Sequence, residues 1–520
     1  MGRLLALLVL LLSVVAQAQP ALAPLASSSF DDIRRGVETL ATSGDARAAP
    51  VLEALQAGRL LVQPGGALFI RTPDGAIEDA ATGAPTPDVA GARPVRVNNA
   101  VRRAVDAAMG GLRLFSPDAA TRAAAAEAVF KSRDAAALPA LDRAIAAERD
   151  AGVRRAMQGA RAAAVLAGDG AEADKVAAVG ALRARGDLDA RGLLASLQGQ
   201  PPAVAAAAAA AVGAIDWQLQ LWGLLQGAFY GLSLGSVLLL AAAGLAITFG
   251  VMGVINMAHG EMVMIGAYVT FVVQELVRAH APGLGWAGVL IAVPLAFLVS
   301  GGLGMVIERG LIRFLYGRPL ETLLATFGLS LVLQQAVRSI FGPTNREVGT
   351  PAWMSGAGQL GQVTLTYNRV AIIVFAAAVL LALMAVLRFT SLGLRMRAVT
   401  QNRRMAAAMG IRTSWVDALT FGLGSGVAGM AGVALSQVDN VSPNLGQGYI
   451  IDSFMVVVFG GVGNLWGTAL GALTLGVVNK FLEPVAGAVL GKIVVLVLLI
   501  LFIQRRPRGM FPLKGRAVEA

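Results

Sequence analysis

Three polar side chains interrupt a long apolar stretch of this 520-residue sequence. They are Asn256, His259 and Glu261, and Gly253 and Gly260 lie beside them. Polar side chains in an apolar membrane segment cost free energy, so they usually serve a solute pathway or a structural hydrogen-bond network. A helix that breaks at these glycines would also expose backbone groups able to hydrogen-bond a polar solute. The alternative is that Asn256 and His259 cap a short loop and Glu261 begins the next helix.

Further amide and hydroxyl side chains extend this candidate pathway. Tyr268, Gln334 and Asn479 lie in other apolar stretches and carry neutral hydrogen-bonding groups. A metal site at His259 and Glu261 is not expected, because further ligands are missing. The chain has no cysteine and two histidines, which excludes disulfide scaffolds, cysteine-bound metal clusters and thiol catalysis.

Two segments resemble nucleotide-binding motifs but lack features that those motifs require. Residues 424–429 satisfy G-x-G-x-x-G, but no strand precedes them and no acidic residue follows at the required distance. Residues 486–493 resemble a phosphate loop, yet Ala486 replaces its first glycine and Ile493 replaces the magnesium-binding Ser or Thr. We therefore expect no ATPase or other enzymatic site, and no cofactor bound by this chain itself.

The composition indicates a membrane protein with a soluble part. Apolar residues make up 56% and charged residues 14%, whereas globular chains average about 45–50% and about 25%. Residues 19–216 are charge-balanced, with 22 basic and 22 acidic side chains, but the rest of the chain from Trp217 carries 20 basic and 10 acidic ones. Basic residues between apolar segments mark cytoplasmic loops, so the net charge of +11 does not indicate nucleic-acid binding.

The chain before Trp217 is predicted to be secreted. Residues 1–18 have the charged start, apolar core and small-residue end of a signal peptide, with an uncleaved anchor as the alternative. Residues 19–214 form an alanine-rich extracytoplasmic domain with a small hairpin near 60–83. Similar segments begin at Asp118 and Asp150, and this spacing favours a HEAT-like helical repeat over a non-repetitive helical bundle.

Residues 217–512 are predicted to be a mainly α-helical, polytopic membrane bundle. Successive charge-free runs, each needing about 20 residues to cross the bilayer, indicate eight to ten spans. An outer N-terminal domain and an Arg-rich cytoplasmic end require an odd number, so nine is expected, with residues 513–520 as a cytoplasmic tail. Glycines recur every four residues at 223–235 and 463–471, which favours close helix packing within the chain over a dimer seam.

Five segments in order resemble one known family. The resemblance is to the membrane permease subunits of branched-chain amino acid type ABC importers, and within them to the urea permease branch. The long N-terminal domain departs from the plain amino acid permeases and looks like the urea branch. The segments are INMAHGEMVMIGAY at 255–268, IERGLIRFLYGRP at 307–319, SLGLRMRAVTQNRRMAAAMGI at 391–411, VVFGGVGNLWGTALGAL at 457–473 and RPRGMF at 506–511.

The resemblance implies a bacterial cytoplasmic (inner) membrane location and a defined set of partners. These are a second homologous permease, two cytoplasmic ATPase subunits that bind ATP and magnesium, and an extracytoplasmic solute-binding protein. The basic loop at 391–411 resembles the coupling helix that docks into the ATPase, where its arginines would meet acidic or polar surface. Its expected coupling residues are Arg395, Arg397, Arg403, Arg404, Ala406, Ala407, Gly410 and Ile411.

The resemblance implies urea as the transported solute. Urea is small, neutral and rich in hydrogen-bonding groups, which suits a pathway of amides and hydroxyls. The alternative within the family is a branched-chain amino acid or a short-chain amide. From other classes, a secondary transporter or a membrane-anchored solute sensor is considered; the few carboxylates in the apolar stretches weigh against ion coupling.

Overall fold

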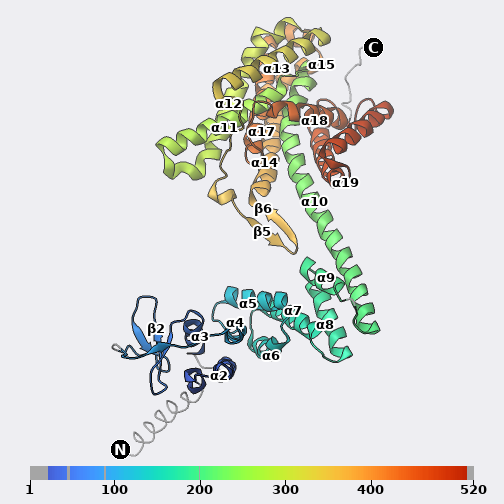
Figure 1. The fold of residues 1–520 in the computed structure, drawn as a ribbon. Helices are drawn as coiled ribbons and strands as arrows, with labels where there is room; N and C mark the ends of the chain where they lie inside the picture. Colours follow the sequence, from blue (N-terminus) through green and yellow to red (C-terminus); the bar gives the residue numbers. More distant parts are fainter. Residues whose placement is uncertain (1–21, 44–46, 87–88, 198, 512–520) are drawn as a thin grey trace, which may run out of the picture. The chain divides into compact units, whose positions relative to one another are not determined.

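The computed structural model describes residues 22–43, 47–86, 89–197 and 199–511. The chain forms two compact units, residues 1–220 and 221–520, and each is described by itself (Figure 1). The predicted signal peptide and the predicted tail at 513–520 lie outside the described residues.

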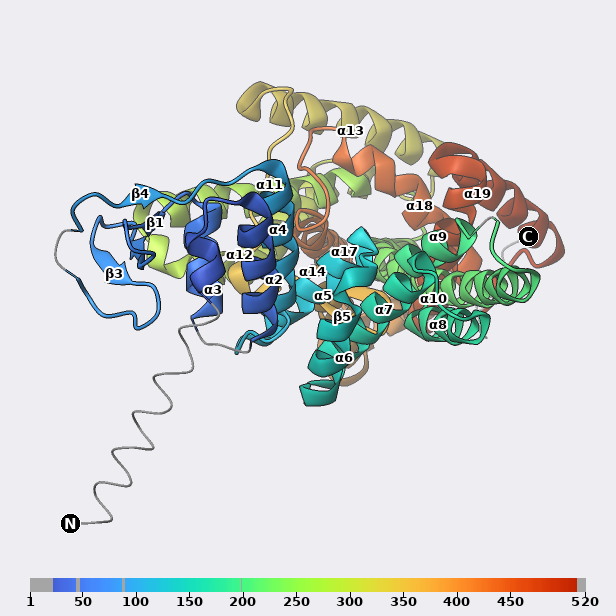
Figure 2. The same cartoon turned by 60° about the horizontal axis from the view of Figure 1, so that its bottom comes forward.

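The first unit begins with short helices and a small antiparallel sheet. Its four strands lie in the order β3-β2-β1-β4, and β1 to β3 fall within the segment where a hairpin is predicted. Figure 2 shows α2, α3 and α4 side by side, and their apolar faces share one core with strands β1 and β2. The elements are η1 (Ala23–Ala26), α2 (Phe30–Thr42), α3 (Ala48–Gln56), β1 (Leu60–Val62), β2 (Leu68–Arg71), β3 (Ile77–Asp79), β4 (Arg93–Pro94) and α4 (Asn99–Arg113).

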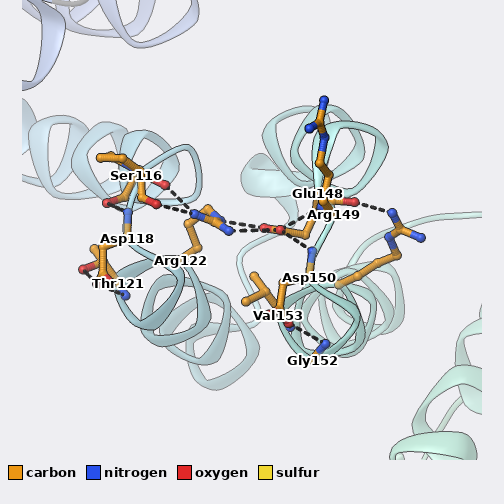
Figure 3. A network of polar contacts seen from close by, with 11 residues as sticks. Ser116, Asp118, Thr121, Arg122, Glu148, Arg149, Asp150, Gly152 and Val153 are labelled. Atoms are coloured by element: carbon orange, nitrogen blue, oxygen red, sulfur yellow. Dashed lines mark hydrogen bonds and ion pairs between the residues drawn. The ribbon is translucent and has the colours of Figure 1, made fainter.

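Five further helices stack on one another around an alanine-rich core. Asp118 and Asp150, which mark the two similar segments of the sequence, cap α5 and α7 by accepting from the backbone N–H groups of Thr121 and Val153. A buried ion pair between Arg122 and Glu148 joins the helices next to these caps (Figure 3). The helices are α5 (Ala119–Ser132), α6 (Leu138–Ala147), α7 (Ala151–Ala167), α8 (Glu172–Arg185) and α9 (Leu188–Ala195), with η2 (Ala135–Ala137) before α6.

The second unit is a helical bundle with one exposed hairpin. Within the described residues, seven helices are long and apolar enough to cross a membrane. They are α10 (Pro202–Met252), which begins in the first unit, α11 (His259–His280), α12 (Gly288–Gly310, in a span that runs over Pro282–Phe314), α13 (Pro319–Phe341), α14 (Tyr367–Phe389), α17 (Thr413–Leu435) and α19 (Leu465–Arg505). The shorter elements are η3 (Pro282–Ala287), η4 (Ile312–Phe314), η5 (Ala352–Met354), β5 (Ala357–Leu360), β6 (Val363–Thr366), α15 (Ser391–Gln401), α16 (Arg403–Ala408) and α18 (Leu445–Gly460).

The lengths of two helices, α18 and α19, affect how many times the chain crosses the membrane. The helix α18 is apolar but has 16 residues, fewer than the about 20 of an ordinary crossing. The helix α19 has 41 residues and bends at Gly487, whose φ of 77° and ψ of 164° are not helical (Figure 1). The predicted number of nine therefore depends on whether α18 and each half of α19 cross the bilayer.

The helix α17 lies at the centre of the bundle. Its glycines meet the backbones of three neighbours: a Cβ on Gly424 would lie 2.6 Å from the carbonyl oxygen of Gly244 on α10, and one on Gly429 would lie 2.6 Å from that of Ala296 on α12. On α11, a Cβ on Gly266 would lie 2.0 Å from the oxygen of Gly429. The G-x-G-x-x-G pattern of residues 424–429 is thus a helix-packing surface, where small residues let backbones approach.

The glycines spaced by four on α10 also pack within the chain, as their spacing predicts. A Cβ on Gly231 would lie 2.6 Å from the Cα of Val477, and one on Gly235 would lie 2.8 Å from the Cα of Leu473, both on α19. Gly223, at the start of the same series, has open space around it. Close packing of α10 on α19 therefore accounts for the inner part of this series.

Candidate functional site

The polar segment singled out in the sequence is a break between two helices. The helix α10 ends at Met252 and α11 begins at His259. In between, the side-chain oxygen of Asn256 accepts from the backbone N–H of Ala258 at 3.0 Å, so Asn256 caps the loop as in the simpler interpretation. The break also contacts α13, because the backbone N–H of Met257 donates to Oγ1 of Thr326 at 3.1 Å.

His259 contacts α10 through one of its two ring nitrogens. Its Nε2 lies 2.9 Å from the backbone oxygen of Ala241, and the side chain is buried. Nδ1 has no hydrogen-bond partner in the described part of the chain. No group of three or more His, Cys, Asp or Glu side chains within these described residues could hold a metal ion.

Glu261, in the first turn of α11, forms a buried polar cluster with α13. Its Oε1 accepts from Ser330 Oγ at 2.8 Å and from Gln334 Nε2 at 2.7 Å. Glu261, Ser330 and Gln334 are 1%, 5% and 6% exposed. Gln447 of α18 donates from Nε2 to Oε1 of Gln334 at 3.3 Å and lies at the edge of this cluster. The second carboxylate oxygen, Oε2, is buried without a partner among the described residues.

The polar face of α13 is longer than the sequence analysis recognised. Thr322 and Thr326 lie on the same face as Ser330 and Gln334, at four-residue spacing, and all four are buried. Both threonine hydroxyls donate to carbonyl oxygens of their own helix, which satisfies them without a solute. The signal was present in the sequence, since polar residues repeat at 322, 326, 330 and 334 and so share one helix face.

The remaining predicted pathway residues lie apart from these contacts. The ring of Tyr268 packs 4.7 Å from that of Phe341, and its hydroxyl is buried without a partner in the described residues. Asn479 lies half-buried on α19, and none of the hydrogen bonds of the buried polar cluster reaches it. The structure therefore brings Glu261 and Gln334 together, but not Asn479.

The predicted coupling loop forms the two short helices α15 and α16. Asn402 caps α16, since its Oδ1 accepts from the backbone N–H of Met405 at 3.0 Å. Gly410, with φ of +84°, follows the helix, and Ala406 is buried while Ala407 is exposed. These features give the short helix with a small-residue face and a glycine stop that the sequence indicates.

Arg403 makes contacts within the chain and also keeps an exposed surface. Its guanidinium forms an ion pair with Asp417, a fully buried residue in the first turns of α17, while 45% of the Arg403 side chain stays exposed. It also lies 4.8 Å from the centre of the Tyr316 ring, whose hydroxyl donates to Oε1 of Glu308 at 3.1 Å. Arg403 thus ties the coupling segment to α12 and α17.

The other coupling residues show what the loop leaves accessible. Arg395 and Arg404 are exposed, and Ile411 is half-buried. Arg397 is exposed and donates to the backbone oxygen of Leu387 at the end of α14. Three large apolar side chains of this segment are exposed: Leu394 at 62%, Met405 at 60% and Met409 at 80%. The accessible surface is therefore a small apolar knob flanked by arginines.

Comparison with known proteins places this bundle in a family. Residues 227–503 match the family described as "Branched-chain amino acid transport system / permease component". The chain is 31% identical over 293 residues to the high-affinity branched-chain amino acid transport system permease protein LivH of Escherichia coli (strain K12), covering 55% of this chain and 94% of that protein. It is 32% identical over 298 residues to the corresponding permease protein BraD of Pseudomonas aeruginosa, covering 56% and 96%. No solved structure matches this chain.

The chain belongs to the branched-chain amino acid transport permease family. A more distant relative is the probable branched-chain amino acid transport permease protein LivH of Methanocaldococcus jannaschii, 24% identical over 292 residues, covering 53% of this chain and 88% of that protein. These three relatives carry branched-chain amino acids in their names, so the comparisons give no support to urea as the solute. The permease match begins at residue 227, and the first unit lies outside it.

Proposed function

We propose that this permease is the membrane-spanning subunit of an ABC importer and that it carries a branched-chain amino acid into the cell. The observation that supports this most is the family match over residues 227–503, with relatives covered over nearly their whole length. Buried polar groups in an otherwise apolar bundle mark the route that a polar solute takes. The buried polar cluster of Glu261, Ser330 and Gln334, next to the helix break at 253–258, is the inner part of that route.

Energy for transport comes from separate ATPase subunits, which bind ATP and magnesium. The knob formed by Met405, Ala407 and Met409 enters an apolar groove of an ATPase subunit, and Arg395 and Arg404 contact its polar rim. Movement of the ATPases is passed through Arg403 to Asp417 on α17. Glycines let the backbone of α17 contact the backbones of α10, α11 and α12 directly. A displacement of α17 therefore shifts all three helices.

The topology that fits this function has nine crossings. In this arrangement α18 and the two halves of α19 each cross once, and the ends of α12, α14 and α19, with Arg309, Arg388 and Arg505, lie in the cytoplasm. The rule that basic residues flank spans on the cytoplasmic side supports it. The first unit is then extracytoplasmic, where it is available to a solute-binding protein, and the partner of the bundle is a second, homologous permease.

Urea remains a second candidate solute. The observation that favours it is the first unit, which lies before the matched residues and sets this chain apart from relatives covered to 94% and 96% of their own length. The neutral donors and acceptors of Ser330 and Gln334 also suit an uncharged solute. Against it, the relatives are named for branched-chain amino acids.

Uptake measurements in cells that express the whole importer test the proposal. Cells that express the permease with its neighbouring ATPase, second permease and binding-protein genes are expected to accumulate labelled leucine, and to lose this uptake when the ATPase carries an inactivating substitution. Uptake of urea instead of leucine would overturn the substrate and leave the importer class intact. Uptake without a functional ATPase would indicate a secondary transporter, and purification with no ATPase bound would favour a solute sensor.

A further inference from the structure

A second polar site lies in the bundle, apart from the buried polar cluster. It is a cavity of about 160 Å³ between α10, α14, α18, α19 and the segment that follows α17. A cavity of this volume has room for several water molecules. We call it the outer cavity, because in the nine-crossing topology the start of α14 and the end of α17 face the outside.

Both signs of charge line the outer cavity. Arg369 and Lys480 supply the positive groups and Asp439 the negative one. The ion pairs that the described residues form include neither Arg369 nor Asp439, whereas Lys480 pairs with Glu483 at 2.5 Å. The guanidinium of Arg369 lies 4.8 Å from the centre of the Tyr230 ring, which holds it in place without neutralising it. Arg369 and Asp439 thus place opposite charges at one small cavity without forming an ion pair; Asp439 lies at the surface, where its Oδ1 accepts from the backbone N–H of Asn440 at 2.8 Å.

The rest of the wall is aliphatic except for Ser233 of α10 and Tyr449 of α18. Leu234 and Val237 of α10, Leu435 of α17 and Val438 just after it line the cavity. Leu435 and Val237 are buried and Val438 lies at the surface. A small solute with a donor and an acceptor at one end could pair with the charged groups, and an aliphatic side chain would then face these residues.

The outer cavity adjoins the buried polar cluster through α18. Tyr449 of α18 lines the cavity, and two residues earlier Gln447 donates to Gln334 of the cluster. Tyr449 also packs against the apolar group of Met264, Tyr268 and Leu445, which separates the two polar sites. The first two turns of α18 therefore form the barrier between the cavity and the inner route.

We infer that the outer cavity is the site at which the permease receives its solute from outside. The solute presents a carboxylate or carbonyl oxygen to Arg369 and Lys480 and an ammonium or amide N–H to Asp439. This rests on the proposed function and deepens it. A branched-chain amino acid and urea share this pair of groups, and the aliphatic wall favours the amino acid.

A thiol-protection experiment tests the site without requiring transport. The chain has no native cysteine, so Val438→Cys places a single thiol at the mouth of the cavity, in the full chain assembled with its partners in nanodiscs. Leucine is expected to slow modification of this thiol by a maleimide at least threefold, with no effect on Leu360→Cys, an exposed position on the β5–β6 hairpin. Adding Arg369→Gln or Asp439→Asn is expected to abolish the protection, whereas Arg278→Gln, which removes an exposed arginine paired with Glu275, is expected to preserve it.

The outcomes separate the possible solutes and the two proposals. Protection by urea but not by leucine would retain the site and assign it to urea. Equal modification with leucine, urea or neither would overturn the site, as would protection that survives both cavity substitutions. Protection by leucine in a chain whose uptake ignores the ATPase would support the site while overturning the proposed importer class.

Discussion

Glu261 and Glu148 are both buried carboxylates, but their hydrogen bonding differs. Both oxygens of Glu148 accept: Oε2 from Arg122 Nε at 2.6 Å, and Oε1 from Arg122 Nη2 at 3.0 Å and from the backbone N–H groups of Arg149 and Asp150 at 2.9 Å each. Glu261 uses one oxygen and leaves the other unpartnered within the described residues. A buried acceptor without a partner costs free energy, so we propose a solute-binding role for Glu261, whereas Glu148 stabilises the first unit.

Glu148 gives the first unit a pH dependence. The hydrogen bond from Arg122, followed by those from the backbone of Asp150 and Arg149, lowers the pKa of Glu148 from 4.5 to about 2 against the opposing effect of burial. A carboxyl whose pKa is lower in the folded state stabilises the fold above its unfolded pKa, and this contribution is lost as the pH falls from about 4.5 toward about 2.

We therefore expect local opening around Arg149 and Asp150 in acid. Hydrogen exchange of the full chain, corrected for intrinsic rates, should show faster opening of these two amides at pH 3 than at pH 6. The variant Glu148→Gln should open readily at both values and lose the difference. Asp142→Asn, which removes the acid of an exposed ion pair with Arg161, should leave the difference unchanged, and a wild-type chain with equal opening at both values would contradict this account.

Gln334 is the residue of the buried polar cluster whose loss should affect transport most. Gln334→Ala removes the 2.7 Å hydrogen bond to Glu261 and the site that a solute would share. Because a buried acceptor then loses a donor, we expect a stability loss of about 1–3 kcal/mol and about a tenfold fall in solute uptake. Gln447→Ala, at the edge of the cluster, should lower uptake less than twofold. Unchanged uptake and unchanged competition by analogues in Gln334→Ala would remove this residue from the pathway.

At the scale of helices, the coupling segment and α17 act as one mechanical element. Asp417 is buried at the start of α17 and pairs with Arg403 of α16. Arg403 also lies over Tyr316, which in turn donates to Glu308 of α12. A force applied to α16 therefore reaches two of the helices that pack in the centre of the bundle.

Breaking this ion pair should separate ATP hydrolysis from transport. Asp417→Asn keeps the shape of the side chain and removes its charge, so Arg403 is no longer held. Solute uptake by the assembled importer is expected to fall about tenfold, while ATP hydrolysis continues at half of its rate or more. Arg404→Gln, an exposed neighbour, should leave the ratio of uptake to hydrolysis unchanged. Equal loss of both activities in Asp417→Asn would mean that the pair serves folding alone.

The sequence predicts elements in this chain better than it predicts contacts between them. The break at 253–258, the short helix before Gly410 and the packing glycines of α10 follow from local residue types, which act within one or two turns. The ion pair between Arg403 and Asp417 does not follow from local residue types, because the two residues meet only after the chain turns from α16 into α17. Ser330 was missed for a related reason: a serine can satisfy itself on its own helix, so its hydrogen bond to Glu261 appears only when α11 and α13 are packed together.

For the whole molecule, the path of the chain after α17 decides on which side of the membrane the outer cavity lies. Nine crossings and seven crossings both place Arg505 on the cytoplasmic side when the first unit is outside, because both numbers are odd. The location of the C-terminal end therefore cannot distinguish them. The start of α19 can, since Trp466 lies inside if α18 crosses and outside if it does not. The packing favours the inside, because Gly463 meets Gly250 at the end of α10 while Val477 meets Gly231 farther back along α10.

The absence of native cysteine makes this distinction measurable with single thiols in intact cells. With nine crossings, Val485→Cys beside the bend of α19 should be modified by a membrane-impermeant maleimide, and Trp466→Cys only after the membrane is permeabilised. With seven, Trp466→Cys should react from outside and Val485→Cys should be shielded by lipid. Leu360→Cys on the β5–β6 hairpin and Met409→Cys after α16 serve as outer and inner references, because both side chains are exposed. The nine-crossing result would also place Lys480 and the outer cavity on the side from which the solute arrives.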